Sequence, residues 1–87
     1  MTLRLTLLAR AYCHLCDEMR EGVLRLAAGR PVVVEELDVD ASAELEARYG
    51  DLVPVLFAGP VAAGRELCHY VLDEACVRAF LAEGGPG

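Results

Sequence analysis

Cys13 and Cys16, two cysteines three positions apart, stand between two apolar segments of different periodicity. The preceding segment, residues 3–9, has the pattern of a strand with apolar side chains on both faces. After the cysteines, apolar residues recur at helical spacing as far as Ala27, and Gly29 is placed to end that helix. A strand that leads through two thiols into a helix favours an α/β fold, with both thiols at a helix start.

The rest of the chain also divides into strand-like and helix-like segments. We predict a second strand from residue 32 to near 40, a third over 53–57 and a fourth over 65–71. A short helix capped by Asp40 and ended by Gly50 should follow the second strand, and a last helix capped by Asp73 should follow the fourth. The first three strands, joined by helical crossovers, should be parallel, and the fourth should run against the third. The order β-α-β-α-β-β-α predicts one four-stranded mixed sheet with helices on both faces.

The composition is that of one small domain. With 87 residues, 55% of them hydrophobic and 25% charged, the chain has material for one core and is too short for two. We place the domain at residues 1–83 and a disordered tail at 84–87. The net charge of -6, with no lysine and no basic patch, argues against nucleic acid or an anionic membrane as partner.

The cysteine content and the apolar runs bear on the compartment. Residues 1–9 do not have the pattern of a cleavable signal, and no run is long enough to span a membrane. A chain with a real apolar core does not need structural disulfides. We therefore expect a cytoplasmic monomer whose four cysteines are normally reduced.

The element order resembles the thioredoxin fold in its minimal, glutaredoxin-like form. The resemblance rests on the two cysteines after the first strand, on Val53-Pro54 at the opening of the third, and on Asp73 before the last helix. More narrowly, the segments 12–19 and 53–56 are similar to a little-characterised bacterial glutaredoxin-like family. The resemblance implies a cis Val53–Pro54 peptide beside the cysteines. There, the Val53 backbone would pair with an extended thiol-bearing peptide, so that Val53 and Pro54 bind substrate.

Two features of many glutaredoxins are missing. Ala11 occupies the position of a basic residue two before the first cysteine, and residues 68–72 replace a paired-glycine motif that holds glutathione. The usual glutathione contacts are therefore not encoded, and glutathione stays only a candidate co-substrate.

The two cysteines carry the predicted chemistry. Unpaired N–H groups in a first helical turn favour a thiolate, so we predict that Cys13 attacks and the more buried Cys16 resolves the mixed disulfide. A structural pair, an idle relic or half of a zinc site are the alternatives. Zinc would need further ligands, and no second CxxC or pair of histidines is present, so we predict no metal. His14, when protonated, would stabilise the thiolate, and Tyr12 would contact a substrate peptide. Both could equally be ordinary surface residues.

The remaining thiols and the last histidine have simpler interpretations. Cys76 falls on the apolar stripe of the last helix and is predicted to be a small core residue. Cys68 on the edge strand is predicted to be structural, with a regulatory thiol as the alternative. His69 is predicted to face solvent without a partner.

The leading hypothesis is a small thiol–disulfide oxidoreductase that serves cell redox homeostasis or electron transfer. It would need no metal or prosthetic group. It would act on a protein disulfide or on glutathione, and either glutathione or a flavin-dependent reductase would regenerate it. The rival hypotheses are a non-catalytic module that binds a peptide at the Pro54 edge, and a protein that holds an iron–sulfur cluster between two copies through Cys13.

Overall fold

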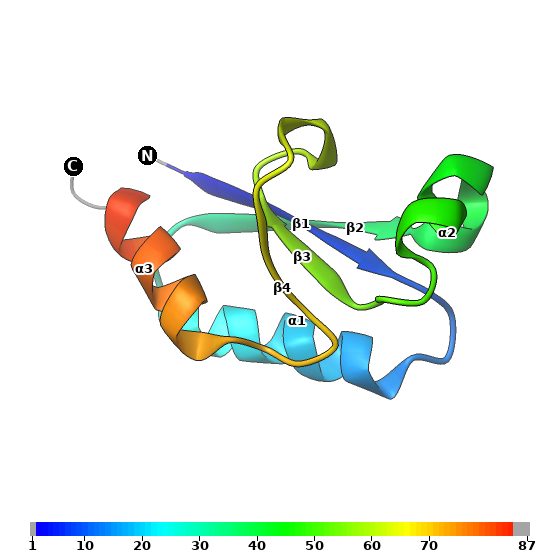
Figure 1. Ribbon diagram of the computed structural model, residues 1–87. Helices are drawn as coiled ribbons and strands as arrows, with labels where there is room; N and C mark the ends of the chain where they lie inside the picture. The colour runs from blue at the N-terminus through cyan, green and yellow to red at the C-terminus, as the bar shows by residue number, and fades with distance from the viewer. Residues whose placement is uncertain (1, 85–87) are drawn as a thin grey trace.

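The computed structural model describes residues 2–84 and shows the predicted order of elements (Figure 1). The strands are β1 (Leu3–Ala9), β2 (Val32–Asp38), β3 (Val55–Ala58) and β4 (Glu66–His69). The helices are α1 (His14–Ala27), α2 (Ala43–Tyr49) and α3 (Glu74–Gly84), with 3-10 turns η1 (Val39–Ala41) and η2 (Val61–Ala63). Residues 85–87 of the predicted tail lie outside the described residues.

The four strands form one mixed sheet in the order β2-β1-β3-β4. β1 is parallel to β2, whereas β3 is antiparallel to β1 and β4 is antiparallel to β3. The prediction that the first three strands are parallel is therefore wrong for β3. The seven residues of α2 span about 10 Å, whereas the seven of β2 span about 23 Å, so this helix cannot return the chain to the start of the sheet. Figure 1 shows α2 beyond the end of β2, where the chain turns back into β3.

The central strands β1 and β3 carry a core on each face of the sheet. One core joins their side chains to α1 and α3, and its largest fully buried members are Leu5, Leu7, Met19, Val23, Leu56 and Val77. The other lies under α2 and consists of Leu8, Val55 and Phe57, with Leu45 and Tyr49 packed against them. The prediction of helices on both faces is thus confirmed. Among residues 2–84, no helix is both long and apolar enough to cross a membrane.

The N-terminus of α2 differs from the prediction. Ser42, not Asp40, is its N-cap, and the Ser42 hydroxyl accepts a hydrogen bond from the Leu45 N–H at 3.2 Å. The turn η1 intervenes between β2 and α2, so Asp40 lies too early in the chain to cap the helix. The Asp40 carboxylate instead forms an ion pair with Arg10.

The buried face of α3 is also displaced from the predicted stripe. Phe80, which the predicted stripe contained, is buried together with Val77 and Leu81. Cys76 of the same stripe is only half-buried, so the prediction of Cys76 as a core residue is wrong. Ala75 and Ala79, the alanines of the predicted stripe, are exposed, because burying valine and leucine removes more apolar surface from water than burying alanine.

The cap of α3 is confirmed and gives a testable prediction. The Asp73 carboxylate accepts a hydrogen bond from the Cys76 N–H at 3.0 Å in the first turn. We expect Asp73→Ala to lower the free energy of unfolding by about 1 kcal/mol, because it leaves a helix N–H unpaired. Asp73→Asn keeps an acceptor and should cost only a fraction of that in urea denaturation. An alanine variant as stable as the wild type would contradict this role.

Candidate active site

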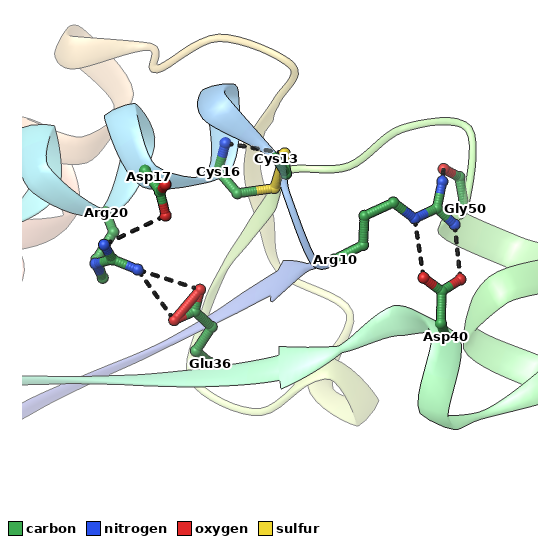
Figure 2. Close-up of a disulfide and its surroundings, with 8 residues drawn as sticks. All are labelled: Arg10, Cys13, Cys16, Asp17, Arg20, Glu36, Asp40 and Gly50. Carbon is green, nitrogen blue, oxygen red and sulfur yellow. Dashed lines mark hydrogen bonds and ion pairs between the residues drawn. A yellow bond between two sulfur atoms is a disulfide. The ribbon is translucent and has the colours of Figure 1, made fainter.

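The two cysteines are joined as a disulfide at the start of α1, with their Cα atoms 5.2 Å apart (Figure 2). Cys13 is the N-cap residue, and its sulfur accepts a hydrogen bond from the Cys16 N–H at 3.1 Å. Cys16 is 1% exposed, whereas Cys13 is partly accessible. The sulfur of Cys13 is therefore the one that a substrate can reach, in the place where helix N–H groups stabilise negative charge.

Pro54 lies at the same end of the sheet as the disulfide. In the antiparallel pairing of β1 with β3, Leu8 is opposite Val55, so Pro54 is adjacent to the end of β1, from which the chain leads to Cys13. The Val53–Pro54 peptide is cis, as the resemblance implied. Within residues 2–84, neither the N–H nor the C=O of Val53 makes a hydrogen bond. Both groups are thus unpaired within that range, which is what pairing with an extended peptide would require.

Tyr12 and His14 flank the reachable sulfur but make no contact that fixes their roles. Tyr12 is fully exposed and has a φ of 59°, and His14 is the exposed first residue of α1. Neither side chain takes part in a hydrogen bond or an ion pair with any residue between 2 and 84. Substrate contact by these two residues stays a prediction.

The acidic residues that follow the disulfide differ in their partners. Asp17 lies 3.3 Å from Arg20, which also reaches Glu36 of β2 at 3.2 Å (Figure 2). Asp17 therefore shares the single positive charge of Arg20 with Glu36. Glu18 has no cationic partner in the described part of the chain.

Arg10, the basic residue closest before the cysteines, is directed to α2 and its neighbouring loops. Its guanidinium donates to both carboxylate oxygens of Asp40, at 2.9 and 3.2 Å, and to the Gly50 carbonyl at 3.2 Å (Figure 2). The hydrogen bonds that it donates to Asp40 raise the pKa of the Arg10 guanidinium. Arg10 thus ties the end of β1 to these segments. Sequence reasoning missed this pair, because no local signal joins residues 30 positions apart.

Tyr70 is a second residue that the sequence did not single out. It has a φ of 64° in the stretch where many glutaredoxins carry paired glycines. Its N–H donates to the Pro54 carbonyl at 2.9 Å and its hydroxyl to the Asp51 carbonyl. Tyr70 therefore holds both ends of the segment that contains Val53. The turn at Tyr70 also ends β4 earlier than predicted.

His69 has a partner, contrary to prediction. Its Nδ1 lies 2.7 Å from a carboxylate oxygen of Glu66, three residues before it on β4. The side chain is exposed, as predicted.

Cys68 and Cys76 are the thiols outside the disulfide, and they differ in accessibility. Cys68 is 8% exposed, and burial raises the pKa of its thiol. A raised pKa means less thiolate at a given pH, and the thiolate is the reactive form. At pH about 8 we expect iodoacetamide to label Cys76 at least severalfold faster than Cys68 in the native protein.

The pH dependence of that labelling, followed by mass spectrometry, provides the control. The Cys68 rate should keep rising with pH beyond the point, near about 8.5, at which an ordinary thiol is half ionised. Urea should make the two rates equal. Equal rates in the native protein would contradict the burial of Cys68.

The comparisons with known proteins agree with this geometry. Residues 4–82 match the model of the glutaredoxin-like domain (DUF836). The chain belongs to this glutaredoxin-like family. Among curated proteins no significant match was found.

Two solved structures resemble the glutaredoxin-like chain over nearly its whole length. Protein Ne2328 from Nitrosomonas europaea, solved by NMR in solution, is 37% identical, with a TM-score of 0.77 over 90% of this chain and 89% of its own. The X-ray structure of protein XcR50 from X. campestris is 38% identical, with a TM-score of 0.71 over 92% of this chain and 97% of its own. The fold is thioredoxin-like, and the Cys13–Cys16 disulfide fits a thiol redox role.

Proposed function

We propose that this glutaredoxin-like protein is a dithiol oxidoreductase that reduces disulfides through Cys13 and Cys16. The observation that carries the proposal is the asymmetry of the pair. The Cys13 sulfur is partly accessible and accepts a hydrogen bond from a helix N–H, whereas Cys16 is buried beneath it. An attacking thiol needs access and a stabilised thiolate, and a resolving thiol needs only to lie close to the attacking one.

The proposed cycle moves two electrons. The Cys13 thiolate attacks one sulfur of a substrate disulfide and forms a mixed disulfide, while the other substrate sulfur leaves as a thiolate and takes up a proton. Cys16 then loses its proton and attacks the Cys13 sulfur. The second substrate thiol leaves and takes up a proton, and the Cys13–Cys16 disulfide remains. A two-electron reductant, either two glutathione molecules or a flavin-dependent reductase, restores the dithiol.

Substrate binding would use the groups around the reachable sulfur. The unpaired N–H and C=O of Val53 would pair with the substrate backbone beside Pro54, and the exposed Tyr12 and His14, which are next to Cys13 in the chain, would contact the substrate as well. No prosthetic group enters this cycle. The cycle starts from the reduced Cys13–Cys16 dithiol, and the cytoplasm is a compartment that keeps thiols reduced. We therefore propose that the protein acts there, as a monomer.

Turnover with each candidate reductant tests the proposal. NADPH consumption would be followed with glutathione and glutathione reductase, and separately with thioredoxin reductase, using 2-hydroxyethyl disulfide and insulin as substrates. We expect turnover with at least one pair. Cys76→Ser, which changes a half-buried thiol outside the site, serves as the matched control and should remain active. The absence of turnover with every pair would overturn the proposal and favour a module that only binds peptides.

A further inference from the structure

A groove of about 350 Å³ lies between α1 and the segment that joins β4 to α3. Its floor contains Met19, Gly22 and Leu72. A Cβ atom on Gly22 would collide with the Leu72 side chain, so the glycine allows the α1 backbone and the segment before α3 to approach closely. The volume is sufficient for one or two apolar side chains of a partner.

The walls of the groove expose apolar surface next to the disulfide. Leu15 is 44%, Tyr70 47% and Val71 67% exposed. Leu15 stands between the two cysteines in the chain, and Tyr70 is hydrogen-bonded to Pro54. The groove therefore continues from the redox site along α1. Large apolar side chains exposed together indicate a binding surface.

The rim of the groove is acidic. It carries four charged residues: Glu18, Glu21, Arg25 and Glu74. Arg25 lies 3.5 Å from Glu74, whose carboxylate also lies 3.4 Å from Arg78, so these three residues leave no free negative charge and the acidity of the rim comes from Glu18 and Glu21. Glu18 and Glu21, three residues apart and so neighbours on α1, form no ion pair with any residue in the range 2–84. The net charge of -6 adds to this negative field.

We propose that this groove selects protein disulfides in which the reacting cysteine is flanked by an apolar side chain and basic residues. The apolar side chain would enter between Leu15 and Val71, and the basic residues would pair with Glu18 and Glu21. The inference rests on the proposed function and names its substrate class. The acidic rim also disfavours glutathione, a small anion, as the substrate that this surface recognises. The carboxylates of glutathione would face Glu18 and Glu21, and like charges repel.

Binding to the oxidised protein tests this selectivity without any redox step. The probe is a short peptide with a leucine, two arginines and a serine in place of the cysteine, compared with the same peptide carrying two glutamates instead of the arginines. We expect the basic peptide to bind about five- to tenfold more tightly at low salt, since two partly exposed ion pairs form. The preference should shrink in roughly 0.5 M salt. In NMR titrations, the amide signals of Leu15 and Val71 should shift.

Charge variants locate the preference on the groove. Glu18→Gln combined with Glu21→Gln should reduce the ratio of the two affinities to near one. Glu35→Gln combined with Glu44→Gln removes the same charge from β2 and α2, outside the groove, and should keep the wild-type ratio. Leu15→Ala should weaken the binding of both peptides alike, because it removes apolar contact only.

Three outcomes would overturn the inference: equal affinity for the two peptides, a preference that survives in the groove variant, or a loss of preference in the control variant. Disulfide turnover in any of these cases would leave the proposed oxidoreductase intact. Conversely, the protein could bind the basic peptide selectively and show no disulfide turnover. That result would refute the proposed oxidoreductase and support the groove as a peptide-binding site.

Discussion

Cys13→Ser is expected to abolish disulfide reduction, with turnover falling about a thousandfold or more. A serine hydroxyl at the N-cap would still accept the hydrogen bond from the Cys16 N–H, so the helix start should remain intact. It would not form a nucleophilic anion at neutral pH. Turnover with insulin and the preferred reductant gives the measurement, and circular dichroism shows whether the fold is kept.

Cys16→Ser should fail at a different step. The Cys13 thiolate can still attack, but the mixed disulfide has no internal thiol to resolve it. We expect one equivalent of substrate to accumulate on Cys13, visible as an added mass that dithiothreitol removes. An adduct that accumulates on Cys16 in the Cys13→Ser variant, with none on Cys13 in the Cys16→Ser variant, would reverse the two roles. Cys76→Ser should neither lose turnover nor accumulate an adduct.

The first half of the fold could be predicted closely from local signals. The bounds of β1 follow from its apolar run, and the N-terminus of α1 follows from its cysteines. These signals act over a few residues, and nothing distant competes with them. The same is true of Asp73, because its carboxylate accepts a hydrogen bond from an N–H only three residues further along the chain.

The errors arose where distant segments decide the outcome. The direction of β3 depends on whether α2 can span the sheet, and the helical pattern alone does not show this. The buried face of α3 depends on which side chains fit between β4 and α1. Asp40 was assigned to a local cap, whereas an arginine 30 residues away binds it. Long-range packing and pairing thus override local preference in each case.

The candidate site shows the same division. The sequence placed Cys13 and Cys16 at a helix start, and the resemblance placed the cis Pro54 beside them. The groove could not be predicted, because its walls come from α1 and from the segment before α3, which meet only in the folded chain. A residue such as Val71 has no periodic pattern that marks it as a binding surface.

The largest expected effect on stability comes from Leu56 in the central strand β3. Leu56 is 0% exposed and packs in the core between the sheet and the helices α1 and α3. Leu56→Ala should lower the free energy of unfolding by about 3 to 5 kcal/mol, because it removes buried apolar groups and leaves a cavity in a close-packed core. In a domain of this size that is a large share of the total stability.

Leu24→Ala provides a matched control, since Leu24 is 51% exposed on α1 and alanine favours a helix at least as well. Its free energy of unfolding should change by no more than about 0.5 kcal/mol. Urea denaturation of both variants should be measured with the Cys13–Cys16 pair oxidised and reduced. The Leu56 loss should appear in both redox states, because it arises from packing beneath the sheet and not from the disulfide. A loss confined to the oxidised protein would instead mean that the bond, and not the core, holds β3 against the helices.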